Sequence, residues 1–135
     1  MKRIQRVKLS LVKDFAKIVA GQLRGGEILA LVGPLGSGKT TFVKALGKQL
    51  KIKSRISSPT FSLMHEFKSK IKTPTGLKSI KFYHLDLYRT KNFKEIKALG
   101  LLELWGSKNT ITVIEWADKI KKHLPKKTYY VYFKH

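Results

Sequence analysis

The chain of 135 residues contains no cysteine. Without thiols it forms neither disulfides nor thiolate metal sites, and this composition fits a reducing compartment. It also lacks any apolar run approaching the roughly 18 residues of a membrane span, and its N-terminus lacks the apolar core of a signal peptide. These absences predict a chain with no membrane segment and a cytoplasmic location.

Acidic residues are scarce. Eight Asp and Glu stand against 29 Lys and Arg, which gives a formal net charge of +21. Such an excess attracts polyanions: nucleotides, RNA, DNA or an acidic protein face. The basic residues are mostly lysines scattered along the chain, with only five arginines, and this distribution also fits a lysine-biased, solvated surface. Composition alone leaves open whether a basic surface contacts tRNA or any other nucleic acid.

One glycine-rich segment carries a specific chemical signal. Residues 33–40 read GPLGSGKT, the G-x-x-x-x-G-K-T pattern of the phosphate-binding loop of nucleoside triphosphatases. Its glycines allow the backbone N–H groups to point at the α- and β-phosphates at the start of the following helix. Lys39 is expected to reach the β- and γ-phosphates, and the Thr40 hydroxyl to be a Mg²⁺ ligand. The nucleotide-contacting residues predicted here are Gly33, Pro34, Leu35, Gly36, Ser37, Gly38, Lys39, Thr40 and Thr41.

The sequence on either side of this loop supports that interpretation. Residues 27–32 (EILALV) form a short apolar run typical of a buried parallel strand. Residues 41–50 place apolar side chains at helical spacing. A strand before the loop and a helix after it favour a nucleotide-binding loop over an ordinary glycine-rich turn.

The remaining segments alternate between strand and helix patterns. Further strands are predicted at residues 3–9, 61–67, 80–85, 110–114 and 128–133. Helices are predicted at residues 10–23, with Ser10 as N-cap, at 93–99, at 101–105 and in a polar stretch ending at 124. A turn signal at residues 73–76 predicts that strands 61–67 and 80–85 form an antiparallel hairpin with a mobile, lysine-rich tip. The pattern predicts one α/β domain over residues 1–135, with a mostly parallel central sheet, flanking helices and one antiparallel hairpin.

Two of the few acidic residues end predicted strands. Asp86 closes FYHLD and Glu115 closes ITVIE. Ligands gather at the carboxyl edge of open α/β sheets, and Mg²⁺ prefers hard oxygen ligands. Asp86 is therefore the first choice for contact with Mg²⁺, either direct or indirect, and Glu115 for positioning water or metal. A helix-capping or ion-paired role stays open for either carboxylate.

Two further positions are weaker candidates. The loop sequence Ser58-Pro59-Thr60 offers a hydroxyl that could sense the γ-phosphate, as switch loops do. Serine and threonine are also common turn residues. His84 shares a strand face with Asp86 and is interpreted as a structural or supporting residue.

The motifs GPLGSGKTT, SSPTF, HLDLYR, LGL and IEW, in this order and at these spacings, resemble the bacterial TsaE proteins, also called YjeE. These are small P-loop ATPases needed for the threonylcarbamoyl-adenosine modification of tRNA. The resemblance runs from about residue 10 to the end of the chain. It implies ATP and Mg²⁺ as ligands, and the TsaD–TsaB pair as partner. That pair transfers threonylcarbamoyl from an adenylate made by TsaC, and the ATPase supports its turnover.

The resemblance also implies roles for particular residues. It implies a catalytic role for Lys39, Thr60, Asp86 and Glu115. It implies that Thr40, Asp86 and Glu115 bind the metal, and that Trp116 packs near the nucleotide. Asp86 resembles the Walker B-type acid, while Arg89 belongs to the same motif without a defined role. Pro34 stands where the family usually has Asp. It removes a carboxylate and an N–H from the loop, which is expected to lower intrinsic hydrolysis and to leave the Lys39 and Thr40 functions in place.

Two alternatives of other classes stay open on the residues alone. A small-molecule kinase of the same fold needs an acceptor pocket and an arginine-rich lid, yet Arg24, Arg55 and Arg89 lie far apart in the sequence. A nucleotide-regulated nucleic-acid-binding module would account for the charge. Steeply salt-dependent, ATP-independent tRNA binding would favour that module.

Overall fold

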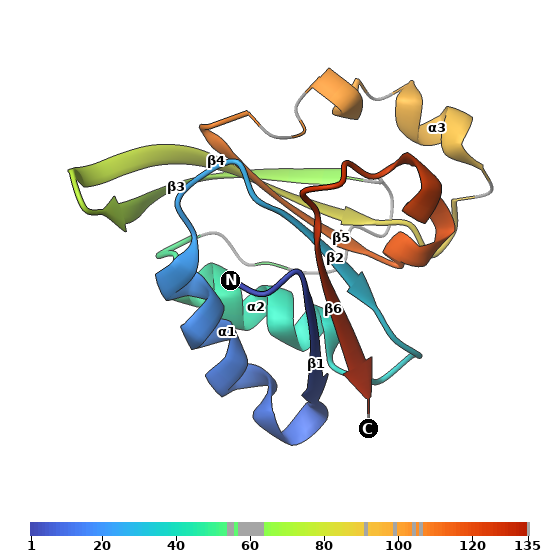
Figure 1. The fold of residues 1–135 in the computed structure, drawn as a ribbon, viewed down its shortest axis with the longest axis horizontal. Coiled ribbons are helices and arrows are strands. Elements are labelled where there is room, and N and C mark those ends of the chain that lie inside the picture. The colour runs from blue at the N-terminus through green and yellow to red at the C-terminus, as the bar shows by residue number, and fades with distance from the viewer. Residues whose placement is uncertain are drawn as a thin grey trace.

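A six-stranded β-sheet forms the centre of the molecule, in the strand order β1–β6–β2–β5–β4–β3 (Figure 1). The computed structural model describes residues 1–53, 56, 64–90, 92–98, 100–103, 105 and 107–134. The strands are β1 (Ile4–Lys8), β2 (Ile28–Val32), β3 (Met64–Thr73), β4 (Gly76–Asp86), β5 (Thr110–Glu115) and β6 (Tyr129–Lys134). All neighbours pair in parallel except β3 and β4, which are antiparallel. The predicted α/β fold class is confirmed.

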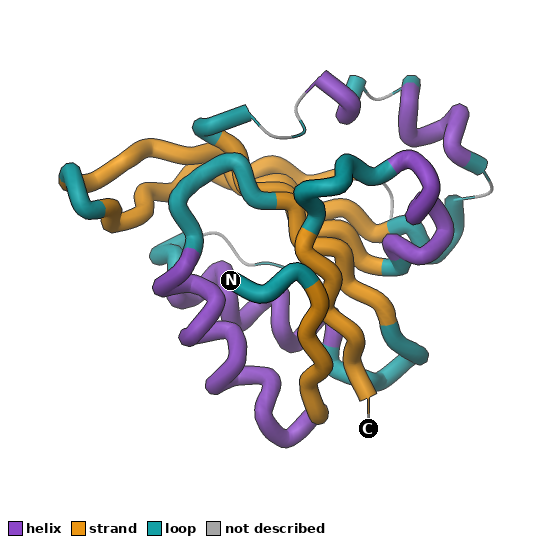
Figure 2. The backbone as a smooth tube through the Cα atoms, viewed as in Figure 1, coloured by secondary structure: helices purple, strands orange, loops and turns teal. Residues whose placement is uncertain are grey.

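Helices cover both faces of this sheet (Figure 2). They are α1 (Val12–Gln22), α2 (Lys39–Gln49) and α3 (Phe93–Lys97), with 3₁₀-helical segments η1 (Leu9–Leu11), η2 (Leu101–Glu103) and η3 (Ala117–His123). Helices α1 and α2 pack together on one face, and α3 and η3 contribute buried side chains to the other. None of the helices in the described residues has the length and apolarity that crossing a bilayer requires.

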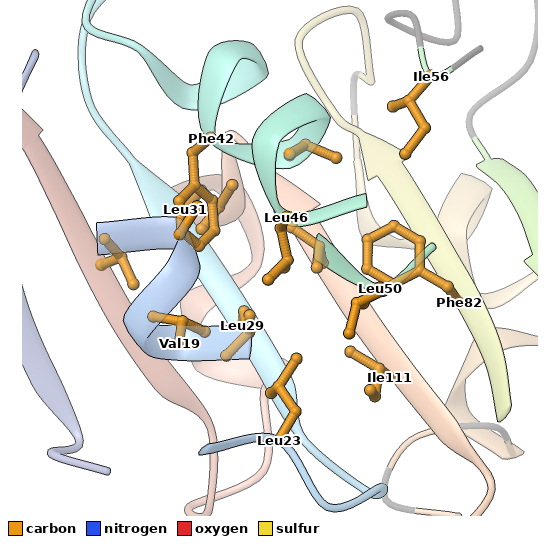
Figure 3. Close-up of a cluster of buried hydrophobic side chains, with 14 of the residues drawn as sticks. Val19, Leu23, Leu29, Leu31, Phe42, Leu46, Leu50, Ile56, Phe82 and Ile111 are labelled. Atoms are coloured by element: carbon orange, nitrogen blue, oxygen red, sulfur yellow. The ribbon is translucent and has the colours of Figure 1, made fainter. Parts of the chain in front are cut away.

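Strand β2 explains why the sheet needs cover on both sides. Leu29 and Leu31 point into the core shared with α1 and α2, where Phe42 is fully buried (Figure 3). Ile28 and Ala30 point into the opposite core. Because successive strand residues face opposite sides, a strand buried on both faces reads as a continuous apolar run, as the sequence of β2 does.

The prediction that Ser10 caps the first helix is wrong. Ser10 lies inside η1, and α1 begins at Val12 without a side-chain cap. The Val12 N–H donates to the Leu9 carbonyl oxygen. A 3₁₀ turn that runs into an α-helix supplies backbone partners at the helix start, so a capping hydroxyl is not required.

The lysine-rich stretch between the hairpin strands is also different from its predicted form. It is strand rather than loop, since β3 continues to Thr73 and β4 begins at Gly76. The Thr73 hydroxyl donates to the Gly76 carbonyl oxygen across the turn, at 2.8 Å between the oxygens. Ile71 and Ile80 are buried on the inner face of these extended strands. This apolar anchor, alternating with lysine, makes the longer strands stable.

Candidate phosphate-binding site

The glycine-rich loop joins β2 to α2 at the carboxyl edge of the sheet. Gly36 and Gly38 have φ values of 76° and 104°, which glycine adopts without steric penalty. Gly38 is the N-cap of α2, so the helix begins at Lys39. A Cβ atom at Gly33 would lie 2.7 Å from the Ser37 hydroxyl oxygen. Two of the glycines are therefore required by backbone conformation and the third by close packing.

The Lys39 side chain lies against this loop with only 5% of its surface exposed. Its ammonium donates to the carbonyl oxygens of Gly33 and Pro34 and stands 3.8 Å from the centroid of the Trp116 ring. Burial lowers the pKa of Lys39, an effect that the negative charge of Glu115 partly opposes. A partly desolvated cation over an aromatic face binds an anion strongly, because phosphate oxygens replace lost solvation.

Glu115 connects three elements at the carboxyl edge. Its Oε1 atom accepts a hydrogen bond from the Thr40 hydroxyl on α2, at 2.8 Å between the oxygens. Its Oε2 atom lies 2.5 Å from the Nε2 atom of His84 on β4, a fully buried side chain. The interpretation of His84 as a supporting residue agrees with this contact, which orients the Glu115 carboxylate.

Asp86 lies beside Glu115, because the two residues are register partners at the ends of β4 and β5. The Asp86 Oδ1 atom accepts a hydrogen bond from the Tyr88 N–H at 3.0 Å. The structure thus brings Lys39, Thr40, Asp86 and Glu115 to one place. Thr60, the remaining predicted catalytic residue, lies outside the described residues.

A cavity of about 300 Å³ joins these side chains. Its lining includes loop residues 34–41 together with Asp86, Glu115 and Trp116, all predicted, and Leu9 and Tyr88, which were not. The Tyr88 and Trp116 rings pack with their centroids 5.1 Å apart. Tyr88 could have been found, since it follows Asp86 by two residues, but no signal in the sequence pointed to Leu9. Arg89 is exposed and is not part of this lining.

Trp116 has an unusual backbone conformation for a residue with a side chain. Its φ of 59° and ψ of 37° are left-handed, which is typically unfavourable by about 1–2 kcal/mol. The conformation places the indole ring under the Lys39 ammonium and against Tyr88. These contacts therefore hold Trp116 in an unfavourable backbone conformation that places its ring in the lining of the cavity.

These residues fit a nucleotide phosphate accompanied by Mg²⁺. The loop supplies backbone donors, Lys39 a cation, Thr40 a hydroxyl, and Asp86 and Glu115 carboxylates. Among the residues that the structure describes, no group of three or more His, Asp or Glu side chains could enclose a metal ion by itself. Mg²⁺ commonly binds in this way, through one or two carboxylates together with phosphates and water.

Comparison with known proteins agrees with the resemblance seen in the motifs. A profile of the family described as "Threonylcarbamoyl adenosine biosynthesis protein TsaE" matches residues 8–135. The chain is 37% identical to the tRNA threonylcarbamoyladenosine biosynthesis protein TsaE of Aquifex aeolicus, over 90% of this chain and 83% of that protein. Its identity to the protein of the same name from Bacillus subtilis is 34%, over 84% of this chain and 65% of that protein.

Two further similarities extend this comparison. The TsaE protein of Rickettsia bellii is 40% identical over 84% of this chain and 72% of that protein. Among solved structures, the crystal structure of Bacillus subtilis YdiB has a TM-score of 0.59 and 30% identity. It covers 89% of this chain and 67% of that one.

A glycine-to-alanine pair tests whether the loop conformation is required. At Gly38, alanine would adopt a φ of 104° and place its Cβ atom 2.9 Å from the Leu9 side chain. We expect Gly38→Ala to lower the free energy of unfolding by about 1–2 kcal/mol, measured by urea denaturation. The control is Gly21→Ala in α1, where nothing lies within 4 Å of the added Cβ atom. It should stabilise the protein by about 0.5–1 kcal/mol. Equal effects at both glycines would contradict this account of the loop.

Proposed function

Because the chain belongs to the TsaE family, which acts in tRNA threonylcarbamoyladenosine biosynthesis, we propose that it is the Mg²⁺-dependent ATP-binding protein and ATPase of that process. The observation that carries the proposal is the convergence of Lys39, Thr40, Asp86 and Glu115 on the 300 Å³ cavity. These side chains supply the cation, the hydroxyl and the carboxylates that phosphoryl transfer uses. The preference for adenine rests on the family resemblance.

Catalysis by such a site consists mainly of charge stabilisation and positioning, since phosphoryl transfer needs little covalent chemistry from the protein. The Lys39 ammonium and the backbone N–H groups at the start of α2 would bind the phosphate oxygens. Thr40 and Asp86, with Glu115, are the residues that would hold Mg²⁺. When bound, Mg²⁺ neutralises negative charge on the phosphate oxygens.

Glu115 is best placed to orient the attacking water. Its carboxylate is 2% exposed and is held from one side by His84 and from the other by Thr40. A side chain fixed at both oxygens keeps one orientation, and a fixed carboxylate would accept a hydrogen bond from the attacking water. His84 acts through Glu115 and is a positioning residue.

Pro34 supports the proposal that hydrolysis by the isolated chain is slow. Proline has no backbone N–H, so the loop has one donor fewer to stabilise negative charge on the phosphates. We therefore assign stimulation of the ATPase to the TsaD–TsaB pair, the partner that the family resemblance implies. Thr60 keeps its predicted role near the γ-phosphate within this proposal.

Removal of the Lys39 ammonium should abolish tight ATP binding. We expect Lys39→Ala to weaken binding of Mg²⁺·ATP by about 100-fold, the loss typical of charge-assisted hydrogen bonds to phosphate. Titration calorimetry measures the dissociation constant. Lys44→Ala is the matched control, because Lys44 is an exposed lysine on the same helix. ATP affinity that is unchanged in Lys39→Ala would contradict the assignment.

Neutralising either acidic residue should separate binding from hydrolysis. We expect Asp86→Asn and Glu115→Gln to keep part of the ATP affinity and to lose hydrolysis by about 100-fold or more, because each removes charge that acts during the reaction. Release of phosphate in the presence of the TsaD–TsaB pair measures the rate. Asp14→Asn, an exposed position on α1, is the control. Wild-type hydrolysis in both acidic-site variants would show that the wrong carboxylates were chosen.

A further inference from the structure

A second and larger cavity, of about 1420 Å³, lies beside the β3–β4 hairpin. It shares no lining residue with the nucleotide cavity. Its lining contains one acidic residue, Glu66, and six lysines. The lysines are Lys51, Lys53, Lys68, Lys70, Lys78 and Lys81. We refer to this cavity as the lysine groove.

Little of the positive charge in the lysine groove is neutralised by the described residues. The Lys81 ammonium lies 3.6 Å from the Glu66 carboxylate, and no other lysine of the groove forms an ion pair with an acidic residue in the described ranges. Lys68 stands directly opposite Lys81 in the antiparallel ladder. Like charges at opposed positions destabilise a sheet. A negatively charged ligand would relieve this repulsion.

The hairpin that borders the lysine groove extends beyond the rest of the sheet (Figure 1). Strand β5 pairs with β4 only from Lys81 to Asp86, so the hairpin continues as a two-stranded ribbon past Lys81. Lys68, Lys70 and Lys72 alternate along one face of that ribbon and are exposed. Alternate strand residues are about 6.7 Å apart, so the charges form a regular row along an accessible edge.

We propose that the lysine groove binds the phosphate backbone of RNA. Lysine is depleted in protein–protein interfaces, so six lysines around one cavity, with Lys68, Lys70 and Lys81 on the same face of the hairpin, favour nucleic acid over an acidic protein. Lysine also contacts phosphate as a point charge, without the paired donors with which arginine reads a base edge. Binding is therefore independent of sequence. The choice of RNA over DNA rests on the proposed function in tRNA modification.

The lysine groove and the nucleotide cavity lie at opposite ends of the same strands. Lys81 pairs with Thr110 at the start of β5, and Asp86 pairs with Glu115 at its end. RNA in the groove and ATP in the loop would thus occupy separate surfaces that are joined by two paired strands. Loss of one ligand is not expected to abolish binding of the other.

The test compares two triple variants of equal net charge. The groove variant carries Lys53→Gln, Lys68→Gln and Lys70→Gln, and the control carries Lys13→Gln, Lys17→Gln and Lys44→Gln at exposed positions on α1 and α2. Binding of an unmodified tRNA transcript is measured from about 50 to 200 mM salt. The loss of three phosphate contacts should reduce the magnitude of the slope of log affinity against log salt concentration by about 2. It should also lower the tRNA affinity by about 100-fold near 0.1 M salt. The control variant should keep a slope close to that of the wild type.

Several outcomes would overturn the proposal. The first is an equal loss of tRNA affinity in both variants. The second is an unchanged salt dependence of tRNA binding in the groove variant, and the third is no tRNA binding by the wild type. If the groove variant instead lost affinity for the TsaD–TsaB pair alone, the groove would dock a protein. ATP affinity is measured on the same samples. If the groove variant binds ATP normally and its tRNA binding keeps the wild-type salt dependence, only the groove assignment is rejected. If the wild type cannot bind ATP, the proposed function is rejected.

Discussion

The buried carboxylate of Glu115 is the constraint on which the rest of the site depends. It ends β5 and is hydrogen-bonded to Thr40 on α2 and to His84 on β4. Burial of a carboxylate is unfavourable unless its oxygens are paired. Here both oxygens have partners, and those partners fix the start of α2 relative to two central strands. The same contacts fix the position of the phosphate-binding loop relative to Asp86 and Glu115.

Charge is distributed unevenly over the molecule, and the nucleotide cavity and the lysine groove differ in their acidic residues. The chain has only eight acidic residues, and two of them, Asp86 and Glu115, lie together at the carboxyl edge. Their negative charges oppose the lowering of the Lys39 pKa by burial. The lysine groove beside the hairpin has one acid for six lysines. One edge of the sheet is thus suited to a metal-bound triphosphate, and the hairpin to a longer polyanion.

Much of the fold and the site could be predicted from the sequence, and the errors have physical causes. The position of Asp86 and Glu115 at one edge of the sheet could be predicted, because buried parallel strands read as apolar runs whose ends meet at one edge. The contact between His84 and Glu115 could not be predicted, because it depends on the register of β4 and β5. The length of the hairpin was missed because lysine at alternate positions resembles a polar loop. Thr60 stays a prediction.

The most direct test of the central claim is ATP hydrolysis by the purified chain, measured with and without its cognate TsaD–TsaB pair. We expect slow hydrolysis by the chain alone, a strong increase with the pair, and no activity in Lys39→Ala under either condition. A rate that is indifferent to the pair, or one that survives removal of the Lys39 ammonium, would contradict this claim. The small-molecule kinase alternative would then require a screen of acceptor substrates.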